Sequence, residues 1–321
     1  MSSHLRARSL LIALAADAVM GELPNALHPV VWMGRWIGLG ERLILGGWGM
    51  GDGGQEAGGG SRPPPPIPHS PILAWGAIWL GLSAGGVGAL ARLVPQHPLA
   101  QGACASTLLA YRALDRAVGE VQAALERDDL AEARRLLGWH LVSRPTGELR
   151  SDEVAAAAIE SLAENLSDSL IAPVLAYLAG GLPGLAIYRM SNTADAMWGY
   201  HNERYEYLGK AAARLDDLLN LVPSRLSAVL IALATQVINR RGAAAWAVAW
   251  HDHARTASPN AGWPMATMAG ALETVLEKRD HYRLGEGARV ADAAMVGEAR
   301  RIARIVVAGV AIALLCGAIY E

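Results

Sequence analysis

Long apolar stretches dominate the pattern of the chain, and they predict helices rather than strands. Residues 72–91 contain no charged side chain, and a helix of that length spans about 30 Å, the thickness of a membrane's hydrocarbon core. Residues 169–188 are a second stretch without charge, but they contain Pro173 and the run Gly180-Gly181-Leu182-Pro183-Gly184. Because such a run breaks helices, two short helices around a turn and one continuous span are both open.

Two further apolar stretches lie in the second half of the chain. Residues 218–239 are apolar apart from Arg225, and residues 305–320 form a run of sixteen. The last run is short for a span unless the preceding arginines extend their side chains to the membrane surface. All four stretches also have an interpretation as buried helices of a soluble all-α protein. That alternative is weakest for residues 72–91, which are long and free of charge.

Arginines cluster beside these stretches and predict their orientation. Basic residues near membrane spans favour the cytoplasmic side. The clusters are Arg6 and Arg8, Arg240 and Arg241, and Arg300, Arg301 and Arg304. The apolar run at residues 9–16 is only eight residues long and is closed by Asp17, so we expect no cleaved signal peptide.

The rest of the chain predicts polar helices and loops. Residues 46–68 are rich in Gly and Pro, which indicates a flexible loop. Residues 103–141 show the helical spacing of water-exposed amphipathic helices. Strand signals are almost absent. We therefore expect an all-α, polytopic integral membrane protein, a single domain over residues 1–321, with polar helices and loops on the cytoplasmic side.

Composition supports this expectation. Of the 321 residues, 52% are hydrophobic and 18% charged, whereas soluble domains carry about 25% charged residues. The net charge of −2 provides no basic surface for nucleic acid. The two cysteines form no CxxC pair and no disulfide framework.

Acidic and amide side chains are concentrated between residues 144 and 225. Glu160, Glu164 and Asp168 recur every four residues, which places them on one face of a predicted helix. Like charges in a row repel one another unless a cation or a positively charged substrate lies against them. A solvated acidic face is the alternative, and it fits poorly because the segment leads directly into apolar residues 170–178.

More oxygen-bearing side chains follow, among them Asn192, Asp195, Asp216 and Asp217. Carboxylates at the edge of a membrane are costly and usually functional. Clusters of Asp, Glu and Asn suit Mg²⁺, which is commonly shared with substrate phosphates. The sequence has no HExxH motif and no Cys/His cluster, which disfavours zinc. The residues themselves therefore predict a membrane protein with an acidic site for Mg²⁺ and phosphate.

Short motifs in a fixed order extend this prediction along nearly the whole chain. They are His28-Pro29-Val30, AIESLAEN at 158–165, NTADAM at 192–197, NERY at 202–205, ARLDD at 213–217, PSRL at 223–226 and SPNAGWP at 258–264. Each motif alone is weakly specific, but their ordered series resembles the adenosylcobinamide-phosphate synthase family of cobalamin biosynthesis (CobD/CbiB type).

The resemblance implies a multi-pass enzyme of the cytoplasmic membrane, a carbon–nitrogen ligase. Such enzymes join adenosylcobyric acid to (R)-1-amino-2-propanol phosphate, or to the free aminopropanol, through an amide on the f-side propionate. ATP is consumed, with Mg²⁺ as the expected cofactor. The implied partners are the corrinoid, the amine, ATP and the lipid bilayer, with no nucleic acid. Contact with other late cobalamin-pathway membrane enzymes is a further expectation.

The residues expected to perform this chemistry follow from the motifs. Catalytic roles are expected for Glu160, Glu164, Asp168, Asp195 and Asp217. Metal binding is expected for Glu164, Asp168, Asp216 and Asp217. Substrate binding is expected for His28, Asn165, Asn192, Asn202, Arg204, Arg214, Arg225, Ser258 and Asn260. Arginine binds phosphate well as a planar fork, although anchoring helix ends at lipid headgroups explains these arginines about equally well.

Two other classes of function remain as alternatives. A membrane transporter would also place polar residues between broken helices, but the second half of the chain does not repeat the first. A membrane scaffold without catalysis would not need so many Asn and Asp residues beside the bilayer.

Overall fold

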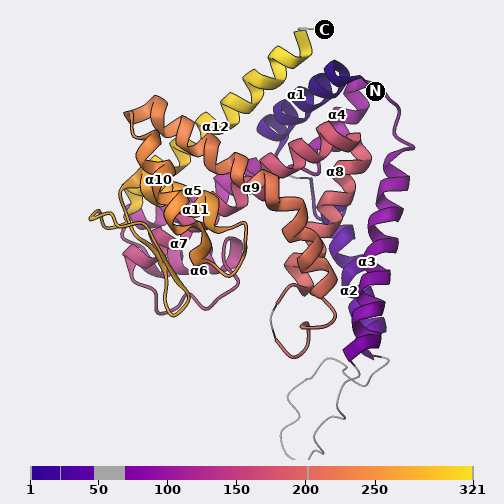
Figure 1. The fold of residues 1–321 in the computed structure, drawn as a ribbon, viewed down its shortest axis with the longest axis horizontal. Coiled ribbons are helices and arrows are strands. Elements are labelled where there is room, and N and C mark those ends of the chain that lie inside the picture. The colour runs from indigo at the N-terminus through magenta and orange to yellow at the C-terminus, as the bar shows by residue number, and fades with distance from the viewer. Residues whose placement is uncertain (1, 22, 47–68, 201, 320–321) are drawn as a thin grey trace, which may run out of the picture.

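A computed structural model describes residues 2–21, 23–46, 69–200 and 202–319. Within these residues the chain forms twelve α-helices, one π-helical turn, one 3₁₀ turn and one small hairpin (Figure 1). The helices of the first half are α1 (Ser3–Met20), α2 (Pro29–Gly46), α3 (His69–Ala91), α4 (Pro98–Ser106), α5 (Tyr111–Glu126), α6 (Leu130–His140) and α7 (Ser151–Leu166). The π turn η1 (Ser167–Ile171) is followed by α8 (Ala172–Trp198), α9 (Lys210–Asn239), α10 (Gly242–Asp252), η2 (His253–Arg255), α11 (Gly262–Leu272) and α12 (Ala293–Ile319).

The expected all-α class is confirmed. Among the described residues, four helical segments are long and apolar enough to cross a membrane: Ser70–Ala91, Ser151–Trp198, Lys210–Asn239 and Ala293–Ile319. Large apolar side chains remain exposed on the outer faces of these helices, such as Leu82 on α3 and Val237 on α9, at 69% and 75%. Apolar surface of this extent indicates a lipid-facing or partner-facing side, which is what a polytopic membrane protein requires.

Each apolar stretch of the sequence corresponds to a helix. The open question at residues 169–188 is answered by α8, in which Gly181 has a φ of 64° and joins two helical segments across a kink. The run at 305–320 belongs to α12, which begins at Ala293 and has 27 residues. That length is sufficient for a span. The predicted loop at residues 46–68 lies, apart from Gly46, outside the described residues.

One element was not expected from the sequence. Strands β1 (Leu276–Lys278) and β2 (Tyr282–Leu284) pair in antiparallel register, with Leu276 opposite Leu284. Both leucines are buried, and Asp280 adopts a positive φ of 62° in the connecting turn. Strands of three residues are too short to show an alternating pattern, so the sequence contains no signal for them.

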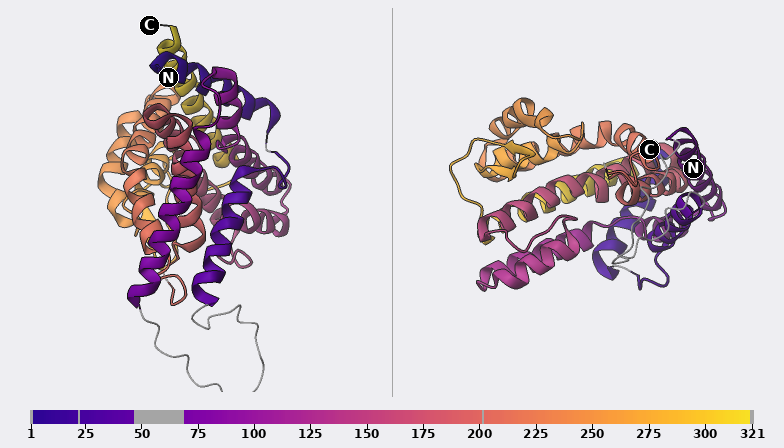
Figure 2. Two further views of the ribbon diagram at one scale, coloured as in Figure 1. Left: turned by 90° about the vertical axis from the view of Figure 1, so that its right-hand side faces the viewer. Right: turned by 90° about the horizontal axis from the view of Figure 1, so that it is seen from below.

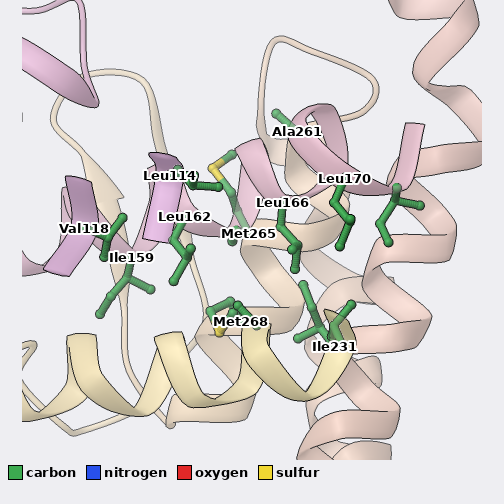
Figure 3. Packing of buried hydrophobic residues seen from close by; sticks show 14 of the residues in the cluster. Leu114, Val118, Ile159, Leu162, Leu166, Leu170, Ile231, Ala261, Met265 and Met268 are labelled. Atoms are coloured by element: carbon green, nitrogen blue, oxygen red, sulfur yellow. The ribbon is translucent and has the colours of Figure 1, made fainter. Parts of the chain in front are cut away.

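The centre of the molecule is α7, which packs against α5, α6, α11 and α12. Its run of alanines at 155–158 is buried and allows the neighbouring helices to approach closely. Each large aliphatic side chain buried around it stabilises the fold by about 1.5–3 kcal/mol. Figure 3 shows part of this cluster, with side chains from α5, α7, η1, α9, α11 and the residue before α11: Leu114, Val118, Ile159, Leu162, Leu166, Leu170, Ile231, Ala261, Met265 and Met268.

The predicted amphipathic helices form one side of this core. Helix α5 turns its apolar residues inward and joins α12 through Asp115. The carboxylate of Asp115 accepts a hydrogen bond from Arg300 Nε at 2.9 Å and another from Arg304 Nη2 at 3.0 Å. Burial alone would raise the pKa of Asp115, but the two guanidinium groups outweigh it and hold that pKa below its ordinary value. The ion pairs therefore join α5 to the basic end of α12.

Helices α2 and α3 form one edge of the molecule and run side by side (Figure 2). The ring of Trp36 stacks on that of Trp79 with 4.9 Å between centroids. At Gly76, α3 meets the backbone of the segment between α8 and α9, and a β-carbon there would overlap the carbonyl oxygen of Leu208. The position therefore requires glycine for close approach.

We expect Gly76→Ala to lower the free energy of unfolding by about 1–3 kcal/mol, because the added methyl group must displace Leu208. Gly85→Ala on the same helix is the matched control, since a β-carbon at Gly85 meets nothing within 4 Å. That variant should be stabilised by about 0.5–1 kcal/mol through helix propensity. Thermal unfolding of both proteins in detergent measures the difference, and equal melting temperatures would contradict the predicted contact.

Candidate active site around the η1 turn

The site is organised by η1, the five-residue π turn between α7 and α8. Single π turns inside helices occur often at functional sites because they shift the direction of the following side chains. Here three consecutive residues of η1 line two different cavities. Ser167 lines one cavity, Ser169 lines the other, and Asp168 lines both.

The first cavity, which we call the acidic cavity, has a volume of about 300 Å³. It lies among α7, η1, α8, α9 and the segment that leads into α11. Its carboxylates come from segments far apart in the sequence: Glu164, Asp168, Asp195, Asp216 and Asp217. Its other polar side chains include Asn220, Ser224, Ser258 and Asn260. The acidic residues that the sequence placed on separate helices therefore converge.

Amide side chains hold two of these carboxylates in place. Asn192 Nδ2 lies 3.3 Å from Asp168 Oδ2 and 3.2 Å from Asp216 Oδ1, and it donates to both. Asn220 Nδ2 donates to Asp216 Oδ2 at 2.9 Å, and its own Oδ1 accepts from Tyr188 Oη at 3.1 Å. Hydrogen bonds to charged groups are stronger than those between neutral groups. This chain of donors fixes the carboxylates that face the cavity.

The segment before α11 is attached to α9 by Asn260. Its Nδ2 donates to the backbone oxygen of Asp217 at 2.8 Å, and its Oδ1 accepts from Arg225 Nη1 at 3.1 Å. The guanidinium of Arg225 also lies over the ring of Trp263, 5.2 Å from the centroid. Asn260 therefore lines the acidic cavity. Arg225 does not line it, but its hydrogen bond holds the Asn260 side chain in place.

The second cavity, which we call the basic cavity, is larger, at about 710 Å³. It lies between η1 and the helices α5, α6, α7 and α8. Its charged residues are three arginines, Arg112, Arg116 and Arg189, with Glu120 and the shared Asp168, and His140 also lines it. Asn165 and Asn192 also line it. A third cavity of about 240 Å³ adjoins the acidic cavity at Asp217 and contains Lys210 and Arg214.

The donor set of the acidic cavity suits Mg²⁺ only in part. Within the described residues, no group of three or more Asp, Glu, His or Cys side chains is arranged to hold a metal ion. Mg²⁺ is usually bound by one or two carboxylates together with waters and substrate phosphates. The carboxylates present therefore fit an ion that arrives with a nucleotide better than an ion held by protein alone. Metal binding by Glu164, Asp168, Asp216 and Asp217 stays a prediction.

Most of the predicted site residues line these cavities, but several do not. Glu160 lies 3.5 Å from Arg144 in an ion pair outside both the acidic and the basic cavity. The pKa of the neighbouring Tyr282 is raised above its ordinary value, mainly by burial and secondly by the charge of Glu160. Glu160 therefore does not line the acidic cavity, which Glu164 and Asp168 share.

Three predicted substrate-binding residues make their contacts elsewhere in the fold. Arg204 Nη2 pairs with Glu41 of α2 at 2.8 Å. His28 Nδ1 accepts from the backbone of Val30 at the start of α2. The side-chain Oδ1 of Asn202 accepts hydrogen bonds from the backbone nitrogens two and three residues further along the chain. None of the three lines the acidic or the basic cavity.

Other cavity residues were not selected from the sequence. They include Ser167, Ser169, Asn220, Arg112, Arg116, Arg189 and Lys210. Asn220 lies four residues after Asp216. That spacing places both side chains on one helical face, so the sequence does contain a signal for Asn220. The arginines of α5 had no such signal, because only the packing of α5 against α7 and η1 brings them to the site.

Comparison with known proteins gives a consistent result. The family model described as CobD/Cbib protein matches residues 10–311. "Cobalamin biosynthesis protein CobD" of Dehalococcoides mccartyi is 41% identical over 280 residues, which cover 87% of this chain and 86% of that protein. The CobD protein of Klebsiella pneumoniae is 38% identical, covering 81% and 79%. "Cobalamin biosynthesis protein CbiB" of Salmonella typhi is 35% identical, covering 90% and 86%. No solved structure matches the chain.

Proposed function

This chain belongs to the CobD/Cbib protein family and has a role in cobalamin biosynthesis, and from that premise we propose that it is an ATP-dependent amide synthase. Its substrates are adenosylcobyric acid and (R)-1-amino-2-propanol, free or as the phosphate. The product is adenosylcobinamide or its phosphate. The acidic cavity, in which five carboxylates surround about 300 Å³, is the observation that supports this proposal most.

The proposed reaction has two steps. The f-side propionate is a poor acyl donor, so a carboxylate oxygen first attacks the γ-phosphorus of ATP, forming an acyl phosphate and releasing ADP. The amine nitrogen then attacks the acyl carbon. A carbon–nitrogen bond forms, the carbon–oxygen bond to phosphate breaks, and inorganic phosphate leaves. The nitrogen gives up its proton to a carboxylate base.

The residues of the acidic cavity suit the first step. Glu164 and Asp217 belong to different helices and line the same space, so both can face the phosphates of one nucleotide. Mg²⁺ bound together with the nucleotide would neutralise the negative charge of the phosphates. Asp168 and Asp195, on the η1 and α8 side, are the carboxylates proposed to receive the proton from the amine.

The proposed location is the cytoplasmic membrane, with the site on the cytoplasmic side. ATP is available there, and the arginine clusters of the sequence favour this orientation. Four helical segments able to cross a membrane support the membrane location.

A strain that lacks this chain tests the proposed step. We expect it to accumulate cobyric acid and to recover cobalamin-dependent growth on supplied cobinamide, because the block lies between the two compounds. Corrinoid analysis of the cells measures the accumulation. Growth restored by cobyric acid alone would show that the step is assigned wrongly.

Removal of single charges from the acidic cavity tests the site. Glu164→Gln and Asp217→Asn keep the side-chain volume but weaken metal and phosphate binding. Product formation should fall by about 10²–10³, or roughly 3–4 kcal/mol of transition-state stabilisation, while the protein remains folded and membrane-inserted. Raised Mg²⁺ should restore part of the activity.

Glu132→Gln is the control for these variants, since Glu132 pairs with Arg135 on the exposed face of α6. Its turnover should stay near normal. If both Glu164→Gln and Asp217→Asn also turn over at nearly the normal rate, the cavity is a solvated acidic surface and the site assignment is wrong.

A further inference from the structure

The acidic cavity accounts for only one end of a nucleotide. Among the described residues that line it, none is cationic and none is aromatic. Mg²⁺ and the carboxylates suit the phosphates, as proposed above. The base at the other end of a nucleotide is a planar ring, which binds best against aromatic side chains or guanidinium groups. The base of a nucleotide whose phosphates lie in the acidic cavity therefore needs an adjoining space.

The third cavity adjoins the acidic cavity most closely. Both are lined by Gly199, Ala213, Asp217 and Ala257, whereas the basic cavity shares only Asp168 with the acidic cavity. The third cavity has a volume of about 240 Å³ and lies among the end of α8, the segment that follows it, the start of α9 and the segment before α11. The two spaces meet at the shared residues, so one ligand can occupy both.

Aromatic side chains form much of the wall of the third cavity: Trp198, Tyr200 and Tyr205. The rings of Tyr200 and Tyr205 lie 6.2 Å apart between centroids, at an angle of 44°. Tyr205 is fixed, because its Oη donates to Glu41 Oε1 at 2.8 Å. Tyr200 is 45% exposed, which leaves surface of its ring for a ligand to stack on.

The charges of the third cavity are balanced. Lys210 and Arg214 line it together with Glu206 and Asp217. Lys210 Nζ lies 3.9 Å from Glu206 Oε1, whereas the guanidinium of Arg214 forms no hydrogen bond or ion pair within the described part of the chain. A phosphate in this space would meet the two carboxylates. An uncharged planar ring fits better, because a guanidinium group stacks on such rings.

Trp198 is the independent sign that a ligand belongs in this cavity. The side chain is fully buried, and its Nε1 has no hydrogen-bond partner among the described residues. Buried N–H groups are nearly always paired, and an exception calls for an explanation such as a bound ligand. The ring nitrogens of a purine are acceptors, which is the partner that this donor lacks.

We propose that the third cavity binds the purine base of the nucleotide, stacked against Tyr200 and the guanidinium of Arg214. This inference rests on the proposed function and adds to it the part of the protein that recognises the nucleoside. Arg214, which the sequence predicted to bind substrate, then contacts the base rather than a phosphate. The phosphates extend past Asp217 into the acidic cavity.

Two variants of Tyr200 test the stacking. Tyr200→Leu removes the ring and should raise the KM for ATP about tenfold, because a base–aromatic contact is lost. Tyr200→Phe keeps the ring and should have the KM of the wild type, whereas a role of the hydroxyl in phosphate binding would make both variants equally weak. Trp139→Leu is the control, since Trp139 is 77% exposed on α6 and lines none of the three cavities. All are measured by amide formation with wild-type protein in parallel.

Arg214→Gln separates the base from the phosphates. It should raise the KM for ATP about tenfold, because the stacked guanidinium is lost. Inhibition by tripolyphosphate with Mg²⁺, a probe that has the phosphates but no base, should stay at the wild-type value. Arg135→Gln, which removes an exposed arginine of α6, should change neither measurement.

Several results would overturn the inference. They are an unchanged KM for ATP in Tyr200→Leu or in Arg214→Gln, an equal loss of tripolyphosphate inhibition in Arg214→Gln, equal weakness of Tyr200→Phe and Tyr200→Leu, or a rise in the KM for the corrinoid instead of that for ATP. In each of these cases the wild-type protein still forms the amide from ATP, so the proposed function stands. Absence of ATP-dependent amide formation by the wild type would reject the proposed function and this inference together.

Discussion

The placement of several carboxylates beside apolar helices is the constraint on which the site depends. Charges removed from water are costly unless they are paired or hydrogen-bonded. Asn192 meets part of this cost by donating to Asp168 and Asp216 together, and Asn220 donates to Asp216 from the other side. The remaining negative charge faces a cavity. The same arrangement that is unfavourable for the empty protein is therefore favourable for a cation and the phosphates that accompany it.

The π turn η1 lies between the acidic cavity and the basic cavity and lines both. A continuous α-helix would place successive residues about 100° apart and would keep Glu160, Glu164 and Asp168 on one face. In the structure, Glu160 on α7 pairs with Arg144, and the turn at 167–171 holds Asp168 at the point where the two cavities meet. Catalysis between two bound molecules depends on such positioning more than on the number of acidic groups.

Much of this structure could be predicted from the sequence, and the reasons differ from part to part. Apolar runs are a strong local signal, so residues 72–91 and 218–239 were recognised as helices, and the motif series identified the family. Among the acidic residues, motif membership located Asp217, but spacing on one helix could not show that Glu160 pairs with Arg144 outside the cavity that Asp168 lines. The arginines of α5 and the hairpin at Leu276 could not be found, because long-range packing and three-residue strands produce no periodic pattern.

The most direct measurement is a structure of the protein in a membrane mimetic with a non-hydrolysable ATP analogue, Mg²⁺ and the amine phosphate bound together. We expect the nucleotide phosphates and the ion in the cavity lined by Glu164 and Asp217. The amine nitrogen should lie beside Asp168 or Asp195, the carboxylates proposed to receive its proton. Nucleotide phosphates bound outside this cavity, or an acidic cavity that stays without nucleotide at saturating concentration, would contradict the proposed active site.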